Sequence, residues 1–379
     1  MNKIYLDNSA TTKVDKEVFE EMKPYLTEKY GNPNSLHSFG VEAREAVEKA
    51  RGRVAKLINA RSEEIIFTSS GTESDNLAIK GLVDAYPEKK HIITSKIEHP
   101  AILEVCNYLE KKGFVIDYIS VNEEGIVDLE ELKSKIREDT LLVSIMHVNN
   151  EIGSIQPIEE IARICKEKKT LFHTDAVQSF GKLEIDVRKG VDLLSASSHK
   201  INGPKGVGIL YVMSGIKILP LLHGGRQEKG IRSSTENVAG IVGMGKAAEL
   251  SLKKMKNAGK VKVMREYLIK KLLEIKGGKL NGGMKRIFNN VNVGFENVEG
   301  ESLVMLLDKA GIACSTGSAC SSHSLNASHV LLALGLKENE AHGSLRLTLG
   351  WDVNKKEIDY VAKKTKEAVE RLRGIYGKN

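Results

Sequence analysis

The chain lacks any apolar run long enough to cross a membrane. A membrane-spanning helix needs about 20 consecutive apolar residues, and none occurs among the 379 residues. Residues 1–7 lack the charged and then apolar organisation of a signal peptide, and also the arginine-rich character of a transit peptide. We therefore expect a cytoplasmic protein without a membrane partner.

Concentrated basic tracts are also missing. The formal net charge is +7, which is mild for this length and does not favour a nucleic-acid partner. No Gly-x-Gly-x-x-Gly turn follows an early strand, which argues against a nicotinamide-dependent dehydrogenase.

Cysteine is scarce, and the four residues present form no Cys-x-x-Cys pair. A large cytosolic protein is not expected to contain structural disulfides. Cys106 and Cys165 lie on helical patterns among apolar neighbours, which predicts core residues. Cys314 is interpreted as a strand-end packing residue, with a resolving thiol as the alternative. Cys320 lies among small polar residues that cannot bury themselves, which predicts a mobile loop.

A metal site is the alternative for this region. Cys314, Cys320, His323 and His329 could supply four soft ligands for zinc or an iron–sulfur cluster. Their spacing fits no familiar zinc pattern, so we expect no built-in metal.

What the chain does contain is a regular alternation of strand-like and helix-like segments, with 41% hydrophobic residues. This alternation predicts an α/β protein with a mainly parallel sheet between helices. A long helical pattern over 238–274 is followed by glycine-rich turns, and we place a domain boundary inside it near residue 255. The expected large domain is 15–255, and 256–379 form a smaller α+β domain. Other helices are expected over 16–30, 40–59, 74–86, 100–112, 129–137 and 158–168.

Lys200 directly follows a probable buried strand, residues 191–198. A desolvated lysine is suited to forming a Schiff base with an aldehyde cofactor such as pyridoxal phosphate. A solvent-exposed lysine at a strand end is the alternative.

Other strand ends supply what such a cofactor needs. Asp175 could hold the protonated ring nitrogen, and Gln178 could bond the ring oxygen, although Asp175 could equally be a helix N-cap. Gly71 and Thr72 begin a helix whose N-terminus could bind the phosphate, although an ordinary capping box fits too. His99 could stack on the ring and move protons, although a lone histidine here is more often structural.

Asn150 follows the strand predicted over 140–148 and could bond the ring oxygen from the side opposite Gln178. Open parallel sheets bind ligands at the carboxyl ends of their strands, so we expect all these groups to converge on one cleft.

The chain resembles the cysteine desulfurases of the NifS/IscS group, which are fold-type I pyridoxal phosphate enzymes of the class V aminotransferase type. Besides Glu98-His99, the matching blocks are YLDNSATT (5–12), GNPNSLH (31–37), HVNNEIG (147–153), HTDAVQ (173–178), SHKINGPKGVG (198–208), RSST (232–235) and STGSAC (315–320).

The resemblance implies roles for further residues. Cys320, on a loop over about 314–328, would carry a persulfide, and Arg346 would bind the substrate carboxylate together with Asn150. Thr235 would reach the phosphate of a partner subunit, which implies a homodimer. Ser197, Ser198 and His199 would join Lys200 around the cofactor. The arm up to about residue 14 would pack with the small domain.

The implied activity is removal of sulfur from L-cysteine, which gives L-alanine and a persulfide on Cys320. A sulfur-acceptor protein such as an iron–sulfur scaffold would take the sulfur, and Cys320 could contact a cluster transiently. The alternatives are a selenocysteine lyase or related pyridoxal phosphate lyase, and a non-catalytic sulfur carrier or cluster-assembly scaffold. The presence of Lys200 argues against the non-catalytic carrier or scaffold.

Overall fold

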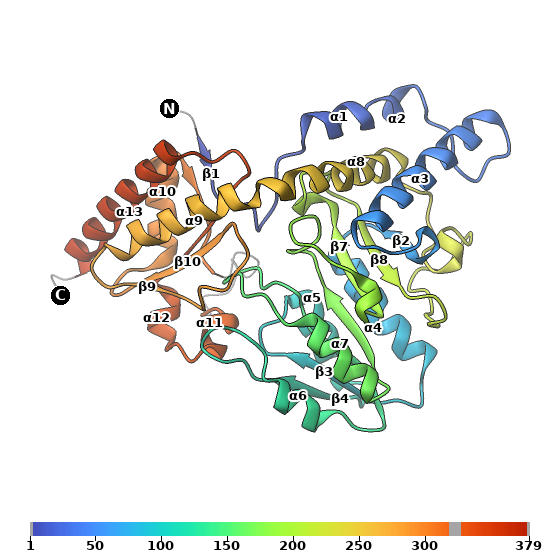
Figure 1. The fold of residues 1–379 in the computed structure, drawn as a ribbon, viewed down its shortest axis with the longest axis horizontal. Coiled ribbons are helices and arrows are strands. Elements are labelled where there is room, and N and C mark those ends of the chain that lie inside the picture. Colours follow the sequence, from blue (N-terminus) through green and yellow to red (C-terminus); the bar gives the residue numbers. More distant parts are fainter. Residues whose placement is uncertain (1–2, 318–326, 377–379) are drawn as a thin grey trace.

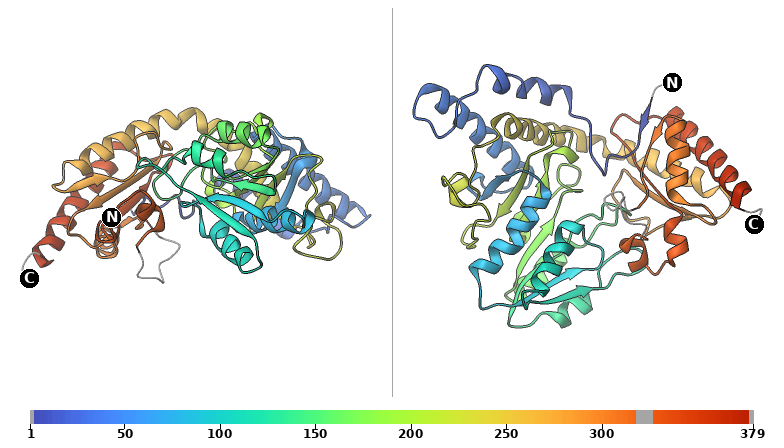
Figure 2. Two further views of the ribbon diagram at one scale, coloured as in Figure 1. Left: turned by 90° about the horizontal axis from the view of Figure 1, so that it is seen from below. Right: turned by 180° about the vertical axis from the view of Figure 1, so that it is seen from behind.

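The computed structural model describes residues 3–317 and 327–376 and has two lobes (Figure 1). The helix α8 (Val238–Lys254), the short helix η5 (Met255–Asn257) and the helix α9 (Ala258–Leu273) run along one edge and join the lobes. Figure 2 shows the same two lobes from below and from behind.

The larger lobe is built on a seven-stranded sheet with the order β2-β8-β7-β6-β5-β3-β4. All strands run parallel to one another except β8, which pairs antiparallel with both neighbours. The strands are β2 (Ile65–Thr68), β3 (His91–Ser95), β4 (Val115–Ile119), β5 (Thr140–Ser144), β6 (Leu171–Asp175), β7 (Leu193–Ser197) and β8 (Gly208–Val212).

Helices cover both faces of this sheet because its strands carry apolar side chains in both directions. Ile93 and Val143 point into a core with α3 and α8, whereas Ile92 and Leu142 point into a core with α4 and α5. The predicted α/β class with a mainly parallel sheet between helices is thus confirmed. The helices of this lobe are α1 (Lys16–Met22), α2 (Pro24–Thr27), α3 (Ser38–Leu57), α4 (Gly71–Ala85), α5 (Pro100–Glu110), α6 (Leu129–Lys135) and α7 (Ile158–Glu167).

The smaller lobe contains an antiparallel sheet of the order β12-β10-β9 and its own apolar core. The N-terminal strand β1 (Ile4–Tyr5) pairs in parallel with β11 (Ile312–Ala313) in this lobe. The remaining elements are β9 (Gly278–Leu280), β10 (Asn290–Phe295), β12 (Ser344–Thr348), α10 (Gly300–Lys309), α11 (His329–Ala333), α12 (Glu338–His342) and α13 (Lys355–Tyr376). The domain boundary near residue 255 stays a prediction.

Two predicted helices were too long. Residues 16–30 form two short helices because Pro24, which has no N–H group, begins α2 and ends α1 at Met22. The pattern over 238–274 is interrupted by the 3₁₀ turn η5. Within 3–317 and 327–376, no helix is long and apolar enough to span a membrane.

Candidate active site

The site residues lie where several strands of the large sheet end. Asp175 is the last residue of β6, and Ser197 is the last residue of β7. Lys200 closes the 3₁₀ helix η3 (Ser198–Lys200) directly after β7, and Asn150 lies in the turns that follow β5. The parallel strands end at one edge, so these residues converge as expected.

Lys200 is half-buried, and its amine faces the N-terminal arm. Its Nζ donates hydrogen bonds to the backbone oxygens of Ser9 and Ala10, the latter at 2.6 Å. Gln178 donates from Nε2 to the same Ser9 oxygen at 2.9 Å. The arm therefore brings Lys200 and Gln178 together, although 169 positions separate Ser9 from Gln178 in the sequence.

A second buried lysine lies beside this pair and was missed in the sequence. Lys182 donates from Nζ to Gln178 Oε1 at 3.3 Å. Burial, and then the charge of Lys200, lowers the pKa of Lys182 to about 7. In the sequence, Lys182 follows Gly181 in a turn between apolar residues. This position was the only indication that the lysine is buried.

His199 turns towards the arm. Its Nδ1 lies 3.1 Å from Thr11 Oγ1, and its backbone oxygen accepts from the Thr12 N–H at 2.9 Å. Burial, followed by the charges of Lys200, Lys205 and Lys182, lowers the pKa of His199 to about 4. A neutral His199 therefore links the arm to the lysine turn at neutral pH.

Asp175 is 5% exposed, and its Oδ1 accepts the Val177 N–H at 2.8 Å. Burial raises the pKa of Asp175 to about 6, while the Val177 N–H and the charge of Lys200 act in the opposite direction. A buried carboxylate next to an amine is suited to holding a cationic ring nitrogen, because such a partner compensates the cost of its burial.

Two further buried acids, Asp75 and Glu98, surround Asp175 and were also missed. Burial raises the pKa of Asp75 well above its usual range, and the charge of Asp175 adds to this. Burial also raises the pKa of Glu98 to about 8, although Ser95 and the Met146 N–H donate to its carboxyl group. Glu98 is therefore held mainly protonated at neutral pH.

Residues 70–72 form a turn that could hold a phosphate. Ser70 caps α4 by accepting the Glu73 N–H at 3.1 Å, which is one half of the capping-box alternative, whereas the Glu73 carboxylate accepts from the Ser69 N–H and not from that of Ser70. A Cβ atom at Gly71 would lie 2.6 Å from Val177 Cγ2 and 3.7 Å from Ser197 Cβ, so only glycine lets the start of α4 approach β6 and β7. Thr72 at this helix start is exposed.

Ser197 and Ser198 are buried, and within the described part of the chain Ser198 Oγ makes no hydrogen bond. Thr235, the residue expected to reach a partner subunit, is exposed on this chain.

His99 caps α5, and its Nδ1 accepts the Ala101 N–H at 3.1 Å. The neutral ring therefore carries its proton on Nε2. Burial lowers the pKa of His99 to about 4, and the positive charges of Lys200 and His329 contribute. His99 is thus a neutral acid–base group close to Lys200.

Arg346 on β12 lies beside Asn150, as a shared substrate-binding role requires. It donates from Nη1 to the Asn150 backbone oxygen at 3.3 Å and pairs through Nη2 with Asp7 Oδ1 at 2.9 Å. Arg346 is 2% exposed, and among the described residues its Nε has no hydrogen-bond partner. A carboxylate substrate could accept from this Nε–H group and displace the carboxylate of Asp7 from Nη2.

Glu151, a further residue missed in the sequence, follows Asn150. Its Oε2 accepts from Ser328 Oγ at 2.5 Å, and a Cβ atom on Gly317 would lie 2.8 Å from that same oxygen. Burial raises the pKa of Glu151 to about 7.

The cysteines divide as follows. Cys106 and Cys165 are buried, which confirms them as core residues. Cys314 is half-buried against the core of the small lobe, and burial raises the pKa of its thiol to about 12. This environment suits packing better than thiolate chemistry. Cys320 and His323 lie outside the described residues.

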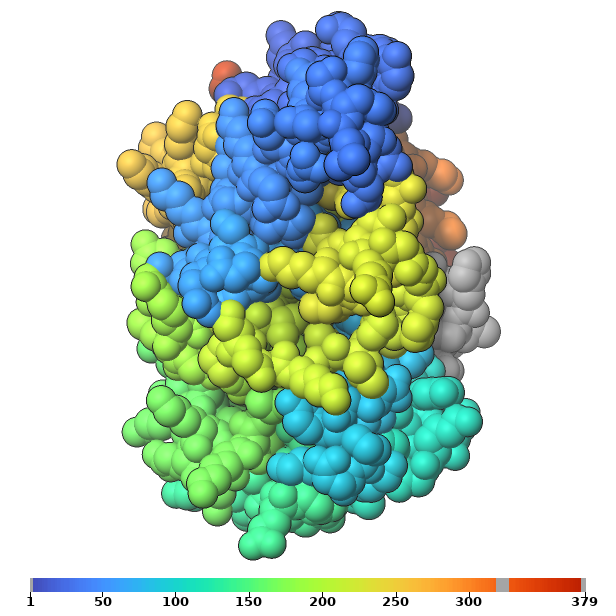
Figure 3. Space-filling model, turned by 90° about the vertical axis from the view of Figure 1, so that its right-hand side faces the viewer, coloured from blue at the N-terminus to red at the C-terminus, as the bar shows by residue number. Residues whose placement is uncertain are grey.

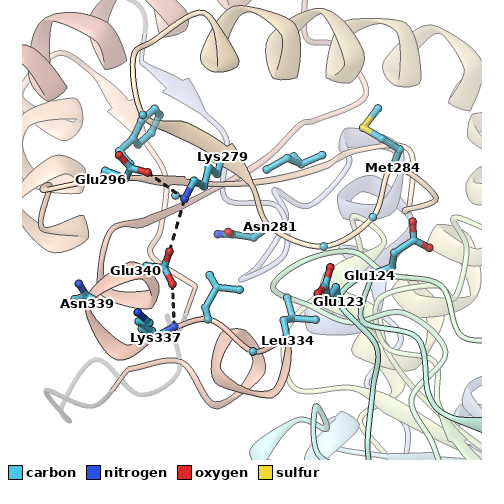
Figure 4. A pocket seen from close by; sticks show the side chains of 18 of the residues that line it. Glu123, Glu124, Lys279, Asn281, Met284, Glu296, Leu334, Lys337, Asn339 and Glu340 are labelled. Carbon is cyan, nitrogen blue, oxygen red and sulfur yellow. Dashed lines mark hydrogen bonds and ion pairs between the residues drawn. The ribbon is translucent and has the colours of Figure 1, made fainter.

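A large cavity lies away from these residues. It has a volume of about 980 Å³ and lies between the small lobe and the turn at Glu123 and Glu124 (Figure 4). Lys279 in its wall is neutralised by ion pairs with Glu296 and Glu340. A smaller space of about 500 Å³ includes Thr72 and His99.

Comparison with known proteins shows the family to which the chain belongs. Residues 4–361 match the family described as aminotransferase class-V. "Cysteine desulfurase IscS" of Dictyoglomus turgidum is 53% identical over 98% of this chain and 96% of its own length. A protein of the same name from Clostridium botulinum is 52% identical over the same shares.

A solved structure titled "NIFS-like protein" superimposes with a TM-score of 0.92 at 43% identity, covering 97% of this chain and 100% of its own. The fold is thereby confirmed as fold-type I, and the cofactor of such enzymes is pyridoxal phosphate. The family match over residues 4–361 and the two relatives near half identity place the chain in the aminotransferase class-V family.

Proposed function

We propose that this chain is a pyridoxal phosphate-dependent cysteine desulfurase that moves sulfur from L-cysteine to Cys320 and releases L-alanine. One observation supports this chemistry most strongly: the half-buried amine of Lys200 lies at the same sheet edge as the buried carboxyl group of Asp175. The relatives named cysteine desulfurase, which match almost the whole chain, support the choice of substrate.

The residues present fit the cofactor. Lys200 would attach it, Asp175 would hold its ring nitrogen, Gln178 its ring oxygen, and the turn at Gly71 and Thr72 its phosphate. When bound, pyridoxal phosphate supplies an electron sink for the α-carbon of an amino acid. Ser197, Ser198 and His199 would line the same pocket.

The substrate would be oriented by its carboxylate. The planar guanidinium of Arg346 can form two parallel hydrogen bonds with a carboxylate, which would replace its bond to Asp7. The hydrogen bond from Arg346 to the Asn150 backbone oxygen places Asn150 beside the guanidinium, so the Asn150 side chain would supply a second polar contact. This arrangement favours α-amino acids over simple amines.

Protons would pass through Lys200 and His99. Once released from the cofactor, the Lys200 amine can remove the α-proton of the substrate. His99, neutral above about pH 4, can accept or return a proton through the same pocket.

The sulfur step would use Cys320. Its thiolate attacks the sulfur of the substrate, the carbon–sulfur bond breaks, and the electron pair returns to carbon, which is protonated to give alanine. Sulfur in a persulfide can then pass to the thiol of an acceptor protein, such as an iron–sulfur scaffold. We also propose a homodimer in which exposed Thr235 reaches the phosphate of the partner.

The test is direct. Purified protein incubated with L-cysteine and a thiol reductant should form alanine and sulfide in equal amounts, and Lys200→Ala should form neither. Release of selenide from selenocysteine without reaction of cysteine would favour a selenocysteine lyase. Absence of both reactions in protein that fails to bind pyridoxal phosphate would favour a non-catalytic scaffold.

A further inference from the structure

The surface segment 226–235 has an unusual backbone. Arg226, Glu228 and Lys229 have φ values of 63°, 45° and 61°. Non-glycine residues rarely adopt this left-handed region, and such a conformation persists only where the surroundings impose it. In Figure 3 this part of the chain (yellow) lies on the surface between the N-terminal helices (blue) and the region of α4 (cyan).

A buried ion pair imposes this conformation. Arg51 donates from Nη1 and Nη2 to the two carboxylate oxygens of Glu228, each at 2.8 Å, and the side chains are only 7% and 4% exposed. Glu228 Oε2 also accepts the Phe67 N–H at 2.8 Å. The segment is thus attached to β2, the strand that leads into the phosphate turn.

The segment then presents Arg232 to the start of α4. Arg232 donates from Nε to Glu73 Oε1 at 2.7 Å and from Nη2 to Glu73 Oε2 at 3.2 Å. Glu73 lies in the first turn of α4, and its Oε2 also accepts the Ser69 N–H at 2.8 Å. Glu73 therefore shapes the turn 69–71 as well as binding Arg232.

At this position the carboxylate of Glu73 opposes the attraction that the N-terminus of α4 exerts on a phosphate. The N-terminus of a helix attracts a phosphate dianion, but an ionised carboxylate in the first turn repels one. Burial raises the pKa of Glu73, yet the hydrogen bonds from Arg232 and Ser69 outweigh burial and leave the pKa below its usual value. The carboxylate is therefore charged, and Arg232 is the cation that cancels its charge.

We propose that Arg232 is a positioning residue for the cofactor phosphate: by neutralising Glu73, it allows the turn that Glu73 shapes to accept a phosphate dianion. This inference rests on the proposed function, since it assumes that pyridoxal phosphate binds at this turn. The buried Arg51–Glu228 pair explains how Arg232 is held in place from a surface segment.

The experiment compares two probes that differ only in the phosphate. The full-length protein, freed of bound cofactor, is titrated with pyridoxal phosphate and with pyridoxal, and both dissociation constants are measured. The variants are Arg232→Met, Glu73→Gln and the double variant, because a glutamine side chain can still accept the Ser69 N–H. Arg61→Met is the matched control, since it breaks the 2.9 Å pair between exposed Arg61 and buried Glu64, which lies at the end of β2 opposite to the turn 69–71.

Arg232→Met should weaken pyridoxal phosphate binding on the order of tenfold and leave pyridoxal binding unchanged, since one uncancelled charge then faces the dianion. The double variant should regain binding to within about threefold of the wild type, because removing the carboxylate of Glu73 removes the repulsion. Arg61→Met should change neither constant.

Two results would overturn the proposal. One is equal weakening of both probes by Arg232→Met, which would indicate general damage to the site. The other is a double variant as weak as Arg232→Met alone. If wild-type protein binds neither probe at Lys200, the proposed function itself fails, and this outcome is distinguishable from both.

Discussion

The substitution Glu228→Gln tests how firmly the strained segment is held. Glutamine keeps a carbonyl oxygen for the Phe67 N–H but leaves the charge of Arg51 without its buried partner. Breaking a buried ion pair on one side costs about 3–5 kcal/mol. For a domain of this size, 1 kcal/mol lowers the melting temperature by about 2–4 °C, so we expect a decrease of roughly 6–20 °C.

Thermal unfolding followed by far-UV circular dichroism measures this decrease. The matched control is Glu159→Gln, which breaks the 2.8 Å Lys189–Glu159 pair, whose side chains are 54% and 65% exposed. An exposed pair contributes about 0–1 kcal/mol, so the control should melt close to the wild type. A Glu228→Gln protein that melts within about 2 °C of the wild type would refute the reasoning.

Three further predictions concern the site. Gly71→Ala should weaken pyridoxal phosphate binding on the order of tenfold in an absorbance titration, because the new Cβ meets Val177 at 2.6 Å; Gly374→Ala, at a position open to solvent, should not. His99→Ala should lower kcat by about 10²–10⁴. Because the pKa of His99 is about 4, this loss should be constant from neutral to alkaline pH in the alanine-formation assay. The pKa of Glu98 is about 8 in the folded protein against an ordinary 4.5, so its stabilising effect is complete at acid pH and is lost as the pH rises to 8. Urea unfolding should show that Glu98→Gln reduces the fall in stability over this range, and an unchanged fall would contradict the assignment.

The main sheet was predictable because its strands are short apolar runs separated by helical patterns, and parallel strands place their ends at one edge. Pro24 could have been recognised as the end of the first helix, since its effect is local. The interruption at Met255–Asn257 could not, because those residues carry no glycine or proline signal.

From the residue pattern alone, the candidate site was predictable where a residue ends a strand or closely follows one. Asp175 ends β6 and Lys200 closes the turn after β7, but no such signal indicates how their neighbours are arranged. Asp7 and Arg346 are 339 positions apart, and Arg51 and Glu228 are 177 apart, so only the fold brings these charges together. Lys182 reads as an ordinary turn lysine until its burial beside Gln178 is known.

The central claim is that sulfur passes from L-cysteine to Cys320 with the help of Lys200. Peptide mass spectrometry after brief incubation with L-cysteine, without reductant, measures this transfer. Wild-type protein should carry one additional sulfur atom on the Cys320 peptide, and Lys200→Ala should carry none. Alanine formation with the additional sulfur on Cys314, or on no cysteine, would contradict the account.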